Sequence, residues 1–202
     1  LAGWLKKPWF GPLVALLCVY ALFSALTPDT FLRSLNLVTM LRQTVVVSIA
    51  AIGMALIIIH GGIDLSVGST VAFATVVAAK ALQAGAGPGT AALTALAVGA
   101  GAGALNGALV VGLRITPFIA TLGTMTALRG IAKGLADEQK IDAPARGLDD
   151  LMAVLPGERL VPHGVWLALA AAVVFALLLN YTRLGRHAVA IGSNELTARL
   201  CG

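Results

Sequence analysis

Residues 43–79 read QTVVVSIAAIGMALIIIHGGIDLSVGSTVAFATVVAA, and Asp64 is the only charged residue among them. A charged side chain at the centre of a membrane helix costs about 2.5–3.5 kcal/mol, so the uncharged windows 43–63 and 65–79 predict two membrane-embedded helices. Gly61 and Gly62 precede the acid, and glycine favours a change of chain direction over a continuous helix. The stretch therefore predicts a break between two helices at residues 61–69.

Four further windows contain no Asp, Glu, Lys or Arg, namely 8–28, 81–113, 115–128 and 160–182. The chain as a whole has 58% apolar residues and a mean hydropathy of +0.93, which is typical of membrane proteins and not of soluble domains. We therefore expect an all-α fold, a polytopic transmembrane helix bundle with about six spans.

Two of the six windows are shorter than a membrane crossing requires. A helix needs about 20 residues to cross the hydrocarbon core, whereas windows 65–79 and 115–128 hold 15 and 14. Interrupted helices in transporters often line a cavity with their freed backbone groups. We therefore expect broken or short helices near 61–69 and 115–128. Two short, tilted helices, lengthened by snorkelling basic residues at their ends, are the other interpretation.

The apolar windows follow one another closely enough to predict a single transmembrane domain over residues 1–202. The chain starts at Leu1 and stops at Gly202 without a polar tail, so we expect it to be a fragment. Lys6 and Lys7 place the N-terminus in the cytoplasm, and six crossings return residues 183–202 to the same side. The opposite side holds eight basic residues against six, diluted by acidic residues, so the parity of the crossings supports this orientation better than the charge count does.

The sequence lacks the residues that several classes of function require. The net charge of +5 comes from basic residues scattered singly between apolar windows, which argues against nucleic-acid binding. Neither H-E-x-x-H nor G-x-S-x-G occurs, and His60, His163 and His187 lie far apart, so we expect no catalytic residues, no metal site and no cofactor. Residues 107–112 have the glycine spacing of a phosphate-binding loop, but the Lys-Ser/Thr pair is absent. This chain should therefore not bind ATP, and any energy for its function must come from a partner or from a gradient.

Asp64 is the acidic residue placed deepest in the apolar sequence, and a buried carboxylate requires hydrogen-bond donors. It can cap the helix that begins near Leu65 by accepting from the backbone amide of Ser66 or Val67. A direct role in binding substrate hydroxyls or in gating is the other interpretation. That role would include the Gly61-Gly62 pair and the hydroxyl of Ser66.

Window 81–113 carries a ridge of small residues at every fourth position, which predicts close packing against another helix. The ridge consists of Ala91, Ala95, Gly99, Gly103 and Gly107. Asn106 lies beside it, and its neutral amide can bond a neighbouring helix or a polyol. Thr121 and Thr124 offer hydroxyls of the kind that bind neutral polar solutes, although threonine in membrane helices also bonds its own backbone.

Several segments, taken in order, resemble one family of membrane proteins. Residues 61–69, GGIDLSVGS, look like the signature of the inner-membrane permeases of ATP-binding-cassette importers for ribose, xylose, arabinose and galactofuranose. Residues 115–125, ITPFIATLGTM, flanked by LNG at 105–107 and LRG at 128–130, are similar to the next landmarks of this family. Residues 182–202 contain TRLGRH, AIGSNE and ARLCG, which resemble its cytoplasmic coupling segment.

The resemblance implies a permease subunit in the lipid bilayer of the cell inner membrane. Such a subunit pairs with a second copy, receives sugar from a periplasmic binding protein and is driven by a cytoplasmic ATP-binding subunit. The resemblance also implies further C-terminal spans, which this chain lacks. The coupling segment, 183–202, is expected to act on the ATPase through Gly192, Asn194, Glu195 and Arg199, because Glu195 and Arg199 are spaced to share one face of a helix. An ordinary solvated loop is the alternative.

These observations favour a non-enzymatic permease subunit that forms the transmembrane pathway for a monosaccharide. The pathway or its gate would include Gly61, Gly62, Asp64, Ser66, Asn106, Thr121 and Thr124. Only Asp64 is well placed for a cation, and no basic residue is well placed for a carboxylate, which favours an uncharged solute. The alternatives are a branched-chain amino-acid importer, which needs a site for a zwitterion, and a gradient-driven carrier, which needs an acidic relay inside its spans.

Overall fold

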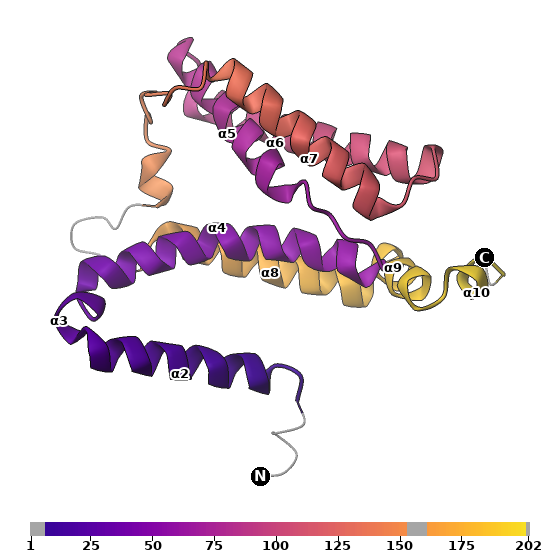
Figure 1. The fold of residues 1–202 in the computed structure, drawn as a ribbon, viewed down its shortest axis with the longest axis horizontal. Helices are drawn as coiled ribbons and strands as arrows, with labels where there is room; N and C mark the ends of the chain where they lie inside the picture. The colour runs from indigo at the N-terminus through magenta and orange to yellow at the C-terminus, as the bar shows by residue number, and fades with distance from the viewer. Residues whose placement is uncertain (1–6, 153–160, 201–202) are drawn as a thin grey trace.

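The computed structural model describes residues 7–152 and 161–200, and Figure 1 shows its ribbon. Within these residues every regular element is a helix, which confirms the all-α expectation. In chain order the helices are α2 (Phe10–Leu26), α3 (Pro28–Phe31), α4 (Ser34–Ile59), α5 (Val67–Gln83), α6 (Pro88–Gly107), the π-helix η1 (Ala108–Gly112), α7 (Pro117–Leu135), the 3₁₀-helix η2 (Asp149–Leu151), α8 (His163–Tyr181), α9 (Arg183–Ser193) and α10 (Glu195–Leu200).

Each of the six apolar windows coincides with one of the longer helices. By length and composition, α4, α6 with η1, and α8 are able to cross a membrane, whereas α2 and α5 are shorter apolar helices of 17 residues each. Helix α7 has 19 residues and continues beyond the predicted window 115–128, through Arg129 and Lys133. Both of these basic residues lie on exposed positions, so the helix can continue without burying a charge.

The long helices form two packed groups. Helix α5 packs against both α6 and α7, whereas α4 packs against α8 and α9. In Figure 1 the first group lies above the second, and α2 runs below them, connected to α4 through the short α3. Residues 60–66 connect α4 to α5 and therefore join the two groups. The break predicted from the sequence is the point where the chain passes from one group to the other.

Helix α4 ends at a glycine in the left-handed backbone conformation. Gly61 has φ +81°, and its N–H donates to the carbonyl of Ile58 at 2.9 Å. The N–H of Gly62 donates to the carbonyl of Ile57, also at 2.9 Å. These two bonds form a Schellman motif, which terminates a helix by satisfying its last carbonyls. Gly62 is also tightly packed, because a Cβ there would lie 3.2 Å from the side chain of Ile57.

The second break lies between α6 and α7. The π-helix η1 extends α6 by one wider turn, and the N–H of Leu113 donates to the carbonyl of Ala108 at 3.3 Å. Arg114 then adopts φ +55°, and α7 begins at Pro117, whose ring suits the first position of a helix. The interruption expected near 115–128 therefore occurs just before α7 and not within it.

The ridge of small residues on α6 packs over only part of its length. Ala91 is fully buried, but a Cβ placed on Gly99, Gly103 or Gly107 would meet no atom within 4 Å. Helix α6 therefore packs against another helix as expected, but not through these three glycines in the part of the chain that is described. A four-residue step advances about 40° more than one full turn, so four such steps rotate the ridge by about 160°. The buried face of α6 instead runs through Ala91, Ala102 and Asn106.

We predict that Gly61→Ala lowers the free energy of unfolding of the full-length protein by about 1–2 kcal/mol, because a Cβ is unfavourable in the left-handed conformation. Gly53→Ala is the matched control, since Gly53 lies inside α4 with no atom near the added methyl group. This control should leave the stability unchanged or raise it by up to about 1 kcal/mol. Chemical unfolding in detergent measures both variants, and equal effects would contradict the role of Gly61 as a helix terminator.

Candidate functional site

Asp64 closes a tight turn immediately before α5. One carboxylate oxygen, Oδ1, accepts a hydrogen bond from the backbone N–H of Ser66 at 2.7 Å and another from the Ser66 hydroxyl at 2.6 Å. The predicted bond from the Ser66 amide is therefore present, although the helix begins at Val67, two residues later than expected. Both donors belong to Ser66, which is the N-cap residue of α5, and no side chain caps the helix itself, so Asp64 holds the turn before α5 and is not its cap as expected.

Ser66 connects this turn to α6. Its side chain is 1% exposed, and the amide nitrogen Nδ2 of Asn106 lies 2.8 Å from its hydroxyl oxygen. Asn106 is 8% exposed and belongs to the last turn of α6. The contact joins residues 40 positions apart in the chain, and it confirms that the Asn106 amide bonds a neighbouring segment. Asp64, Ser66 and Asn106 thus form one continuous hydrogen-bonded row.

Thr121 holds the extended segment that follows the glycine pair. Its hydroxyl accepts from the N–H of Leu65 at 3.1 Å and lies 3.2 Å from the carbonyl oxygen of Ile63, to which it can donate. Thr121 is buried in the second turn of α7, so a side chain of one helix partners the backbone between two others. Thr124 is also buried, but its hydroxyl donates to the Thr121 carbonyl in its own helix, at 3.2 Å.

These contacts define a polar cluster where α5, α6 and α7 meet. We use this name for Asp64, Ser66, Ser69, Asn106, Thr121 and Thr124. Sequence reasoning did not single out Ser69, which is buried and donates to the Ser66 carbonyl at 3.0 Å. Its position in the 61–69 signature, one helical turn after Ser66, was the available signal. The cluster consists of hydroxyls, an amide and one carboxylate, which are groups that can bind a neutral solute wherever the fold leaves one of them without a partner.

The residues proposed for ATPase coupling lie apart from the cluster, in α9 and α10. A Cβ on Gly192 would collide with the carbonyl oxygen of Ile59, so the backbone of α9 rests directly on the last turn of α4. Asn194 caps α10, because its side-chain oxygen accepts from the N–H of Thr197 at 3.0 Å. Glu195 and Arg199 form an exposed ion pair at 2.6 Å. Within residues 183–200 the coupling segment is therefore two short helices and not a loop, and its contact with an ATPase stays a prediction.

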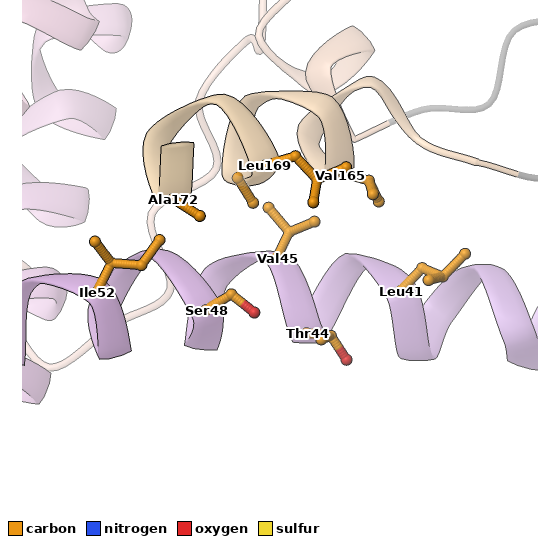
Figure 2. Close-up of a pocket in the computed structure, with 9 residues that line it drawn as sticks. Leu41, Thr44, Val45, Ser48, Ile52, Val165, Leu169 and Ala172 are labelled. Carbon is orange, nitrogen blue, oxygen red and sulfur yellow. The ribbon is translucent and has the colours of Figure 1, made fainter. Parts of the chain in front are cut away.

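A groove lies elsewhere, between α4 and α8. Figure 2 shows Val45 reaching toward Val165 and Leu169 of α8, whereas the hydroxyl of Thr44 points away from that helix. Apart from Thr44 and Ser48, every residue that lines the groove is apolar. A sugar would lose hydrogen bonds to water there without regaining them, so the groove is suited to acyl chains or side chains and not to a polyol.

We predict that Thr121→Val lowers the free energy of unfolding of the full-length protein by about 1–3 kcal/mol, because it leaves the N–H of Leu65 and the carbonyl of Ile63 without this partner. Thr124→Val is the matched control, since its hydroxyl bonds only to its own helix. The control should cost clearly less. Chemical unfolding in detergent compares the two variants, and equal losses would show that Thr121 does not support the break.

Comparison with known proteins shows a clear set of relatives. The chain is 38% identical over 192 residues to the ribose import permease protein RbsC of Escherichia coli (strain K12), covering 94% of this chain and 60% of that protein. It is 35% identical to RbsC of Bacillus subtilis (strain 168), covering 95% and 59%, and 33% identical to the D-allose transport system permease protein AlsC of Escherichia coli (strain K12), covering 98% and 63%. The chain thus spans about three fifths of the length of these relatives.

No solved structure matches the chain. A family model described as "Branched-chain amino acid transport system / permease component" matches residues 36–202, which include α4 except its first two residues and every later helix that the structure describes. The resemblance seen in the motifs is therefore confirmed over most of the sequence. The chain belongs to this family of transport-system permease components.

Proposed function

We propose that the chain is part of the permease subunit of an ATP-driven importer and that the polar cluster lies on the pathway, or at the gate, of a monosaccharide. The observation that carries the proposal is the cluster itself, in which five buried neutral side chains and the part-buried Asp64 lie at a break between apolar helices. Gly61 and Gly62 give this break its conformation. Membrane interiors contain irregular backbone only where protein or a cavity surrounds it, which fits a pathway at this point.

The composition of the cluster favours a sugar over an amino acid. A zwitterion carries a carboxylate that Lys or Arg would favour, and the cluster contains neither. Its only acid, Asp64, is already bonded to Ser66. The names of several relatives refer to ribose import, D-allose transport and fructose import. The family description names branched-chain amino acids, so an importer of these is the second candidate.

A gradient-driven carrier is less well supported. Proton- or cation-coupled carriers use ionisable groups inside their spans as a relay. Asp64 is the only ionisable residue of the cluster, and its hydrogen bonds hold the turn before α5. We therefore assign energy supply to ATP hydrolysis in a separate chain and regard this chain as a non-enzymatic transport subunit.

The partners and the orientation follow from this assignment. We propose a cytoplasmic ATP-binding subunit, a periplasmic sugar-binding protein and a second permease copy in the cell inner membrane. Residues 1–202 then belong to one permease domain, with the N-terminus and the coupling segment 183–202 in the cytoplasm. The ATPase would act through α9, which rests on Ile59, two residues before Gly61. Movement of α9 would therefore reach the break through the end of α4.

Reconstitution of the full-length permease with its ATP-binding subunit and sugar-binding protein in proteoliposomes tests the proposed function. We expect ATP-dependent accumulation of at least one of D-ribose, D-allose and D-fructose, and none of L-leucine. Accumulation of leucine alone would favour the second candidate. Sugar uptake driven by a proton gradient without ATP would contradict the proposal.

We predict that the double substitution Glu195→Ala and Arg199→Ala lowers sugar import severalfold while the partner continues to hydrolyse ATP. The two side chains are 61% and 74% exposed, and such pairs contribute only about 0.3–0.5 kcal/mol to stability, so a large effect on import reports a lost contact with the partner. Uptake and ATP turnover are measured in the same proteoliposomes.

Lys140→Ala with Asp142→Ala is the matched control, because these residues form another exposed ion pair at 2.6 Å, far from α10 in the chain. This control should leave both import and ATP turnover unchanged. Unaltered import in the Glu195 and Arg199 variant would remove the docking role from α10.

A further inference from the structure

The polar cluster contains one buried hydrogen-bond acceptor without a partner. Among the residues that the structure describes, the amide oxygen Oδ1 of Asn106 is the only buried side-chain nitrogen or oxygen that lacks a hydrogen bond. The hydroxyls of Ser66, Ser69, Thr121 and Thr124 are all bonded. A buried acceptor without a donor is unfavourable, so an oxygen left in this state requires an explanation.

The hydrogen-bonded row determines which end of the amide is free. A carboxylate can only accept, so the short contact between Ser66 and Asp64 takes the hydroxyl proton of Ser66. The lone pairs of that hydroxyl must then accept from Asn106, which requires the NH₂ end of the amide to face Ser66. A flipped amide would place two acceptors against each other. The oxygen of Asn106 is therefore the end that points away from the row.

Asn106 itself is buried in regular helix, but the helix becomes irregular just after it and has open space beside its glycines. The π-helix η1 begins at Ala108, two residues later. Such π turns are rare in proteins overall, but those that occur are often found at functional sites. Gly103 and Gly107, on either side of Asn106 in the chain, have no atom within 4 Å of the position that a Cβ would occupy, and the same holds for Gly68 beside Ser66. Bare backbone with open space beside it leaves room for a small ligand to reach the cluster when the helices shift.

We propose that the oxygen of Asn106 accepts a hydrogen bond from one hydroxyl group of the transported sugar and so selects for a hydroxyl at one ring position. The inference rests on the proposed function. Asn106 divides its amide between two tasks: the NH₂ group holds α6 against the turn before α5, and the oxygen remains for a donor. A neutral acceptor suits a polyol, because each hydroxyl that leaves water must find a partner in the protein.

The test compares a sugar with its monodeoxy analogues in proteoliposomes that contain the full-length assembly. The probe is whichever of D-ribose, D-allose and D-fructose the wild-type assembly imports. Its import efficiency, kcat/KM, should fall about 3- to 10-fold for the analogue that lacks the hydroxyl received by Asn106. With Asn106→Leu, which has a similar size and no acceptor, the ratio of import efficiency between the parent sugar and that analogue should be about 3- to 10-fold smaller than in the wild-type assembly. The preference of the sugar-binding protein is the same in both assemblies and cancels in the comparison.

Ser66→Ala distinguishes the role of the Asn106 oxygen from that of the Asn106 NH₂ group. It removes the hydrogen-bond partner of the NH₂ group and leaves the oxygen in place. The deoxy penalty should persist in this variant even where total import falls. Asn106→Gln moves the oxygen by one methylene group, so it should also lower the selectivity and serves where the leucine variant does not assemble.

An unchanged penalty for every analogue in the Asn106 variants would overturn the inference, as would loss of the penalty in Ser66→Ala. Either result is distinct from failure of the proposed function. If the proposed function were wrong, the wild-type assembly itself would show no ATP-dependent sugar import.

Discussion

The structure depends on satisfying the backbone between α4 and α5, where the chain is not helical. Inside a membrane no bulk water is available, so each N–H and C=O of such a segment needs a partner within the protein. The N–H groups of Gly61 and Gly62 return to carbonyls of α4, and that of Ser66 reaches Asp64. The middle of the segment has no such local partner and relies on Thr121 of α7, which bonds Leu65 and lies within reach of Ile63. The position of α7 against α5 is therefore tied to the break itself.

The same requirement explains why a polar cluster is not by itself a binding site. Asp64, Thr121 and Ser69 use their hydrogen bonds to support turns and helix ends, so most of the polar groups that attract notice in the sequence are occupied by the fold. Only a polar group that the fold leaves without a hydrogen-bond partner is available for a ligand. On that basis a carboxylate in a signature motif carries less functional weight than a neutral amide on the next helix.

Local patterns predicted the helices well, because the cost of burying charge acts on each window separately. The windows free of Asp, Glu, Lys and Arg located the six long helices, and the bond from Ser66 to Asp64 follows from residues two apart. The contacts of Thr121 with Leu65 and of Asn106 with Ser66 span 56 and 40 positions, and no local rule pairs them. The end of α7 was missed because the basic residues that closed its window lie at exposed positions. The small-residue ridge was over-interpreted because a four-residue period drifts around a helix of about 3.6 residues per turn.

The contact of Gly192 with Ile59 has a mechanical consequence. The main chains of α9 and α4 meet there without a side chain between them. A change of side-chain rotamer therefore cannot compensate for a movement of α9 toward α4. Helix α4 has 26 residues and is therefore about 39 Å long. A rod of that length converts a tilt of about 5° at one end into a displacement of about 3 Å at the other, by simple leverage. A small rocking of α9 would thus be felt at Ser34, on the opposite side of the bundle, as readily as at the adjacent glycines.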